Sequence, residues 1–261
     1  MDELSRHGAV ALAAALGSGI LVNMAGVLVP AEAAAKARTT KPAEMKKKKT
    51  EQDGGGGGEG GEDVSAAEDL MREHGVLRRT LNVYAEVADR LRTNPRQIDP
   101  KALVDAAELF REFGEDYHER TLEEQFVFPE VRRTGGPNEP LVETLLIQHQ
   151  RGREITDFIR QIGTRGQVDS RAQPLARALA SMVRMYNAHS TWEDTVVFPA
   201  WKKAQSKARL EELAEEFEEI EHQQFGKDGF DDAVARIRRI EKLLGLADLA
   251  HYTAPVLDAG L

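Results

Sequence analysis

The chain has 261 residues, contains no cysteine and carries a formal net charge of -9. Without cysteine there are no disulfides, thiolate ligands or cysteine nucleophiles, so any metal site must be built from His, Asp and Glu. Proteins that bind phosphate backbones need a basic surface, so the acidic composition argues against nucleic acid as a partner. The sequence also lacks the glycine-rich phosphate-binding motifs and the nucleophile elbow, which gives no support to a nucleotide-binding or hydrolase function.

Residues 1–37 have the pattern of an export signal. Arg6 precedes an uncharged run over residues 8–31, and small residues of the kind that signal peptidases accept follow this run. A retained membrane anchor is the alternative, because about 20 apolar residues can span a bilayer. We expect a cleaved signal peptide and a periplasmic or otherwise extracytoplasmic protein. Its contact with a membrane would be limited to an uncleaved N-terminal segment.

Residues 38–63 are rich in lysine and glycine. They contain four consecutive lysines at 46–49 and five consecutive glycines at 54–58. Such a sequence cannot bury enough apolar surface to fold, so we expect a disordered linker. A patch for anionic surfaces, formed by the four lysines, is the alternative interpretation.

From residue 64 onward, apolar residues recur at helical spacing and no segment has a period of two. A capping box at Ser65 and Glu68 predicts the start of a first helix, which should end at Pro95. We expect three further helices, over residues 100–129, 140–162 and 174–197. Residues 64–200 therefore predict an all-α fold, an antiparallel four-helix bundle. Residues 201–261 predict a C-terminal extension with two more helices, near 210–224 and 233–244.

The predicted bundle contains an internal repeat. Segments 118–129 and 189–199 both begin with His and end with Phe-Pro. When the two Phe-Pro pairs are aligned, Glu123 matches Glu193 at an offset of 70 residues. A helix with one His on or near its apolar face precedes each segment, with His74 before the first and His149 before the second. The chain thus consists of two helical hairpins of one design.

The second copy has the spacing of a metal-binding pair. His189 and Glu193 are four residues apart, so they share one face of a helix. Imidazole and carboxylate ligands without sulfur suit iron, manganese or zinc. Two such pairs that face each other across a bundle, with two further His, would hold two metal ions.

The first copy has one extra residue. His118 and Glu123 are five residues apart, and in a regular helix they would not share a face. A single-turn π-bulge between Arg120 and Leu122 would return them to one face, and such bulges are frequent at functional sites. Glu119 or Glu124 are alternative oxygen ligands. Glu123 is preferred because the repeat places it opposite Glu193.

Simpler interpretations exist for each residue alone. One buried His is more often a hydrogen-bonded core residue than a metal ligand, but four in a repeated pattern with Glu partners favour metal binding. Tyr117 and Tyr186 are expected in the core, close to the ligands. In the helix near 210–224, His222 lies about 180° from Leu213, so we expect it to be exposed.

Together these residues resemble the hemerythrin-like, or HHE cation-binding, family. The resemblance is carried by Glu73 and His74 in the first helix, by His118, Glu119, Glu123, Phe128 and Pro129 in the second, by Gln148 and His149 in the third, and by His189, Glu193, Phe198 and Pro199 in the fourth. It implies a four-helix bundle with two non-haem irons, bridged by carboxylates and by an oxo or hydroxo oxygen. Implied ligands are the four His as terminal ligands, Glu123 and Glu193 as bridging or chelating carboxylates, and Glu119 as an additional candidate.

The family resemblance implies a protein that binds or reacts with O2, peroxide or nitric oxide, in an extracytoplasmic redox, sensing or iron-handling role. It leaves open whether the chain is an enzyme. Oxygen-carrying hemerythrins have a second His one turn after the first in the third helix, where this sequence has Arg153. The missing imidazole would leave one metal open, which favours reaction or sensing over reversible O2 carriage.

Two rival functions remain. One is a ferroxidase of the ferritin-like class, which needs Glu-x-x-His on two facing helices. The chain has this spacing at Glu115 with His118 and at Glu219 with His222, although the repeat does not relate the two. The other rival is a metal-free structural bundle in which the His only form hydrogen bonds.

Overall fold

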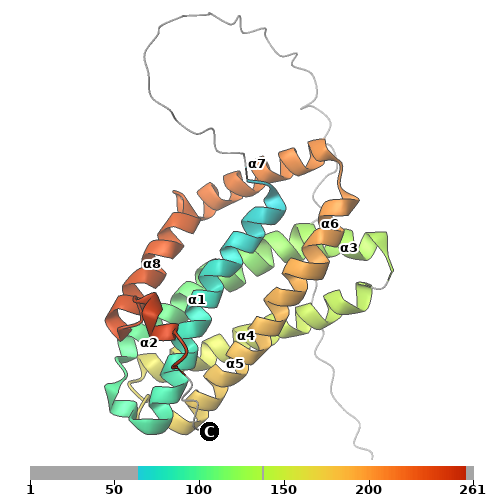
Figure 1. Cartoon of the computed structure of the whole chain (residues 1–261). Helices are drawn as coiled ribbons and strands as arrows, with labels where there is room; N and C mark the ends of the chain where they lie inside the picture. Colours follow the sequence, from blue (N-terminus) through green and yellow to red (C-terminus); the bar gives the residue numbers. More distant parts are fainter. Residues whose placement is uncertain (1–63, 137, 257–261) are drawn as a thin grey trace, which may run out of the picture. The chain divides into compact units, whose positions relative to one another are not determined.

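A computed structural model describes residues 64–136 and 138–256 of the chain (Figure 1). The predicted export signal and linker lie outside the described residues. The described part is helical, as predicted, and forms an all-α bundle with two additional C-terminal helices. Within the described ranges, no helix combines the length and the apolar character that a membrane span requires.

The first helix of the bundle is α1, which covers Ala66–Thr93. Its capping box is present: the Ser65 side chain accepts a hydrogen bond from the Glu68 N–H, and the Glu68 side chain accepts one from the Ser65 N–H. A short 3₁₀ turn, η1 at Pro95–Gln97, follows it. The cap and the proline thus begin and end the helix where the sequence predicts.

The second helix is continuous but has three segments, α2 (Pro100–Leu109), η2 (Phe110–Val127) and α3 (Phe128–Thr134). Asp99 caps its start through the Lys101 N–H. The central segment η2 is a π-helix. The extra residue between His118 and Glu123 is therefore accommodated as predicted, but over 18 residues and not within a single turn.

The third helix is α4 (Glu139–Thr164), and the fourth consists of α5 (Ala172–Trp192), the π-helical η3 (Glu193–Val197) and α6 (Phe198–Ala204). The sequence predicts a regular fourth helix. The structure instead has a π segment in both copies of the repeat, and each segment ends immediately before Phe-Pro.

The predicted ends of the second and fourth helices are wrong, because both helices continue past their Phe-Pro pair. In each copy the Phe N–H donates to the carbonyl of the Glu five residues earlier, Glu123 or Glu193. Where such a π register returns to the α register, one carbonyl has no amide partner. Each proline occupies the first turn of the α segment that follows, a position where proline is tolerated, and the helix continues past it.

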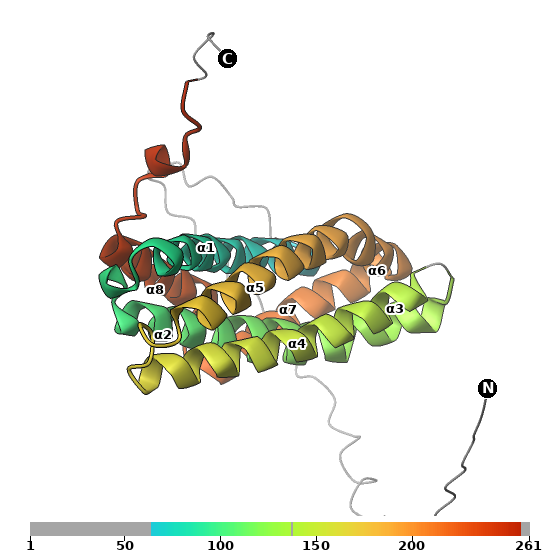
Figure 2. The same ribbon diagram turned by 90° about the horizontal axis from the view of Figure 1, so that it is seen from below.

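The four long helices form two antiparallel layers, with α1 beside α5 and α2 beside α4 (Figure 2). Outside this bundle, α7 (Lys207–Phe225) and α8 (Gly229–Leu244) form a hairpin that packs against α1 and the second helix. A last 3₁₀ turn, η4, covers Leu249–Tyr252. The core lies between the layers, and the predicted ligands are buried within it: His74, His118, Glu119, Glu123, His149, His189 and Glu193.

Candidate metal centre

Four imidazoles meet in two pairs inside the bundle. The Nε2 atoms of His74 on α1 and His118 on η2 are 3.0 Å apart. Those of His149 on α4 and His189 on α5 are 3.2 Å apart. All four side chains are buried. Each of the four long helices therefore contributes one imidazole, as the repeat predicts.

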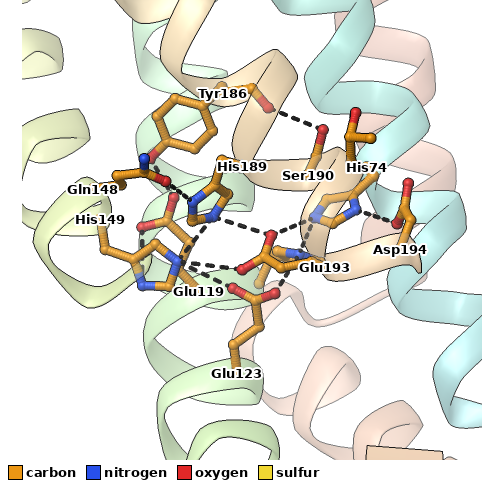
Figure 3. Close-up of polar contacts among 12 residues, drawn as sticks. His74, Glu119, Glu123, Gln148, His149, Tyr186, His189, Ser190, Glu193 and Asp194 are labelled. Atoms are coloured by element: carbon orange, nitrogen blue, oxygen red, sulfur yellow. Dashed lines mark hydrogen bonds and ion pairs between the residues drawn. The ribbon is translucent and has the colours of Figure 1, made fainter. Parts of the chain in front are cut away.

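Two carboxylates lie between the imidazole pairs (Figure 3). Glu123 places Oε1 3.4 Å from the Nε2 of His118 and Oε2 3.2 Å from the Nε2 of His149. Glu193 places Oε2 3.0 Å from the Nε2 of His189 and 3.4 Å from that of His74. Each carboxylate thus contacts one imidazole of each pair, an arrangement in which it can bridge two metal ions.

The carboxylates lack the partners that buried oxygens need. All four oxygen atoms of Glu123 and Glu193 are buried without a hydrogen-bond partner. Leaving buried charged groups unpaired is costly, so the site requires a source of positive charge. Within the described residues, two groups that can each hold a metal ion share Glu123: one with His74 and His118, the other with His149, His189 and Glu193. The donor set therefore fits two cations.

A second set of residues fixes the outer nitrogen of each imidazole. The Nδ1 of His74 lies 2.7 Å from Asp194, and that of His149 lies 2.9 Å from Glu124. The remaining pairs are His118 with Glu73 at 2.5 Å and His189 with Gln148 at 2.9 Å. An Nδ1–H that donates to such an acceptor leaves the lone pair on Nε2, where a metal would bind.

Sequence analysis missed these outer partners, although the repeat contains a signal for them. Glu124 and Asp194 occupy matching positions, each directly after a bridging carboxylate. Each also forms an ion pair with an arginine: Glu124 with Arg153, and Asp194 with Arg78. In both cases the arginine follows, by four residues, the histidine whose Nδ1 the carboxylate faces. Arg153, which the sequence suggests as a lost ligand, is therefore the counterpart of Arg78.

Glu119 does not lie at the centre with the other predicted ligands. It is buried, but its Oε2 is 3.9 Å from the outer nitrogen Nδ1 of His149 and does not lie between the imidazole pairs. The Tyr186 hydroxyl donates to its Oε1, and Arg153 Nη2 is 3.4 Å from its Oε2. The alternative ligand Glu124 also faces this outer nitrogen. Glu123, preferred from the repeat, is the carboxylate that faces the centre.

The Phe-Pro motifs contribute packing directly on the ligands. Phe198 stacks on His74 and Phe128 stacks on His149, each with ring centroids 5.4 Å apart. The interplanar angles are 23° and 22°. The rings therefore restrict both imidazoles in the same way in each copy.

The charges at the centre depend on one another. Burial would raise the pKa of Glu193, but the imidazoles of His189 and His74 outweigh burial and hold it below its usual range. For His149, burial would lower the pKa, yet the carboxylates of Glu119, Glu123 and Glu124 raise it to about 10. The carboxylates thus favour the protonated form of His149 when no metal is bound. Protons and metal ions must compete for this site.

A small cavity adjoins the centre. Its volume is about 10 Å³, close to what one water-sized molecule needs. It is lined by His74, Leu77, Arg78, Leu81, His118, Glu119, Tyr186, His189 and Ser190. Three of the four imidazoles therefore face a space of about the size of one water molecule.

The remaining described His lie apart from this centre. His222 on α7 is exposed, as its position opposite Leu213 predicts, and His251 is exposed as well. The Glu-x-x-His pair that a ferritin-like site would need at residues 219–222 therefore does not reach the bundle interior.

Comparison with known proteins agrees with this architecture. The family model described as the hemerythrin HHE cation-binding domain matches residues 65–157 and 141–254. Uncharacterized proteins of Mycobacterium tuberculosis and Mycobacterium bovis are 43% identical to the chain over 192 residues, which cover 73% of this chain and 74% of each relative. No solved structure matches the chain significantly. With four buried imidazoles and two shared carboxylates at its centre, the chain belongs to the hemerythrin HHE cation-binding domain family.

Proposed function

We propose that the chain holds a non-haem di-iron centre. One iron would bind His74 and His118, the other would bind His149 and His189, and the remaining two ligands, Glu123 and Glu193, would bridge them. The observation that carries this proposal is the set of four buried carboxylate oxygens without hydrogen-bond partners between the two imidazole pairs. Nitrogen and oxygen donors without sulfur are the ligands of non-haem iron.

The proposed reaction partner is O2 or another molecule of similar size, such as peroxide or nitric oxide. The cavity of about 10 Å³ beside the ligands suits a molecule of that size. Iron bound at the centre would supply the electrons that such a molecule accepts. Leu77 and Leu81 give the cavity an apolar wall that excludes bulk water, while the Tyr186 hydroxyl is held in place by Glu119. This supports a redox, sensing or iron-handling role.

The test is metal analysis of full-length protein purified from iron-rich medium. Two irons per chain are expected, with the near-ultraviolet absorption of an oxygen-bridged iron pair. Glu193→Gln removes one bridging charge and should lower the iron content below two. Glu212→Gln, an exposed carboxylate on α7, is the matched control and should bind iron like the wild type. Less than one iron per wild-type chain contradicts the proposal.

A ferroxidase of the ferritin-like class is the second candidate, and His222 separates it from the first. Such a site would need His222 as a ligand, whereas the di-iron proposal leaves this exposed residue unused. We expect His222→Ala to retain the full metal content. Loss of metal in this variant would favour the ferritin-like site.

We further propose an extracytoplasmic location, which rests on the signal-like pattern of residues 1–37. Mass spectrometry of the full chain expressed in a bacterial host tests this proposal. Cleavage after the small residues near position 35 and recovery from the periplasmic or extracellular fraction are expected. An intact N-terminus in the soluble cytoplasmic fraction contradicts it.

A further inference from the structure

The two halves of the metal centre share four features and differ in one of the outer partners of their imidazoles. The matched features are the bridging carboxylates, the acidic partners of His74 and His149, the arginines that bind these partners, and the stacked Phe rings. The exception is the residue before the first imidazole of each hairpin. It is Glu73 in one copy and Gln148 in the other.

Glu73 and Gln148 each contact the Nδ1 of an imidazole, but Glu73 does so with a carboxylate and Gln148 with a neutral amide. The Nδ1 of His118 lies 2.5 Å from Glu73 Oε2, and the Nδ1 of His189 lies 2.9 Å from Gln148 Oε1. Glu73 is buried, with 1% of its surface exposed, so solvent does not screen its charge. The Nδ1 of His118 therefore faces a buried carboxylate where that of His189 faces a neutral amide.

From this mismatch we infer that the two metal positions are unequal, and that Glu73 makes the His74–His118 position the tighter one. The inference rests on the proposed dinuclear function. It assigns Glu73 as a positioning and affinity-determining residue that acts through His118 without contacting the metal. The position at His149 and His189 becomes the weaker one, which fills second and loses its metal first.

The physical reason is the basicity of the ligand. A carboxylate that accepts from the Nδ1–H of an imidazole increases the electron density at Nε2, whereas a neutral amide does so far less. Removal of such a partner typically lowers metal affinity by about 10- to 100-fold.

Acidic groups lie on both sides of the centre. Asp69 on α1 and Glu221 on α7 both lie close enough to Glu73 to be affected by its charge. On the other side, the buried carboxylate of Glu119 acts on His149. The asymmetry therefore rests on the direct contacts of His118 and His189, and not on the number of charges.

The repeat supplies a reciprocal pair of test variants. Glu73→Gln places an amide beside both His118 and His189, and Gln148→Glu places a carboxylate beside both. Each change keeps the shape of the side chain. Metal-free, full-length protein is titrated with Co²⁺, and its d–d absorption reports stepwise binding. Circular dichroism of each metal-free variant checks the fold.

Each variant should change a different step. We expect two Co²⁺ per wild-type chain. Glu73→Gln should weaken the first step by about 10- to 100-fold and leave the second within about twofold. Gln148→Glu should strengthen the second step and leave the first unchanged. The second variant keeps the test valid if the first is unstable, because a gain in affinity cannot come from misfolding.

The outcomes separate this inference from the function on which it rests. Fewer than two Co²⁺ per wild-type chain would overturn the dinuclear proposal itself. Two bound Co²⁺ with steps that neither variant shifts, or a Glu73→Gln change confined to the second step, would overturn the assigned asymmetry and leave the dinuclear centre intact.

Discussion

Gly152 on α4 leaves the space that the Tyr186 hydroxyl occupies. A Cβ at position 152 would lie 2.2 Å from that hydroxyl and 2.9 Å from two carbons of the ring. Gly152→Ala should therefore displace Tyr186 from Glu119 and lower the free energy of unfolding by about 1–3 kcal/mol, the usual cost of overpacking. Urea denaturation of the metal-free protein measures the change.

Gly75 on α1 provides the matched control. It is an exposed helical glycine, and a Cβ there would meet no atom within 4 Å. Gly75→Ala should raise stability by about 0.5–1 kcal/mol, because alanine loses less backbone entropy in a helix. Similar effects of the two substitutions would show that the space beside Tyr186 has no role.

His149 predicts how the stability of the metal-free protein depends on pH. Its pKa is raised to about 10, against about 6.5 in an unfolded chain. Between these values the folded state binds the additional proton, so stability is greatest below the lower pKa and falls as the pH rises toward the upper one. Glu115, with a pKa raised to about 8 by burial and by Glu119, adds to the fall only below that pH.

The measurement is urea denaturation with chelator at several pH values between about 8 and 10. Stability of the wild type should decrease across this range. His149→Gln should give a shallower slope, because its side chain does not titrate. Identical slopes for both proteins would mean that the proton on His149 does not stabilise the fold.

Arg153 shows the limit of residue-level prediction. In the sequence it is noticed only because it occupies the position where oxygen-carrying hemerythrins have a second His. The structure shows that it binds Glu124, which in turn accepts from His149. That chain of contacts joins η2 and α4, so no local spacing could have revealed it.

At the scale of helices, the π segments decide where the ligands lie. The His118 and Glu123 side chains are brought within 3.4 Å of each other although five residues separate them in sequence. The sequence predicts a π segment here, because a five-residue spacing cannot place both side chains on one face of a regular helix. It gives no comparable signal for η3, where His189 and Glu193 already have the regular four-residue spacing.

The prolines that follow the π segments should be unusually well tolerated. Pro199 stands where the register changes, so Pro199→Ala should alter the free energy of unfolding by less than about 1 kcal/mol. Arg184→Pro, at an exposed site inside α5, should cost about 3 kcal/mol or more because it removes an intrahelical hydrogen bond. A large stability gain in Pro199→Ala would contradict the explanation. Thermal unfolding followed by circular dichroism measures both.

For the molecule as a whole, bound metal should hold the four helices together. Each helix contributes one imidazole, so the folded state binds metal and the unfolded chain does not bind it in the same way. At a free metal concentration 100 times the dissociation constant, binding adds about 2.7 kcal/mol, or roughly 5–10 °C in Tm for a domain of this size. Chelator should remove this gain.

Comparison with Glu193→Gln makes the chelator experiment specific. This variant lacks one shared carboxylate and should show a smaller drop in Tm than the wild type when chelator is added. Equal melting temperatures of wild-type protein with and without metal would support the metal-free structural bundle instead.

The sequence by itself determined the helical class, the capped start of α1 and the six residues that converge. Helix starts and apolar stripes depend on contacts within a few residues, and the repeat made distant ligands recognisable as equivalents. The additional candidate Glu119 had the right chemistry, but its position could not be inferred from spacing.

Only the tertiary structure decided the outer contacts of the imidazoles. Glu73, Gln148, Glu124 and Asp194 each accept from an imidazole on another helix. Such contacts depend on the rotation and distance at which the helices pack against one another. These are set by the side chains of the whole core, and not by a local sequence pattern. The same is true of the cavity beside the ligands, because a space exists only where several helices leave a position unfilled.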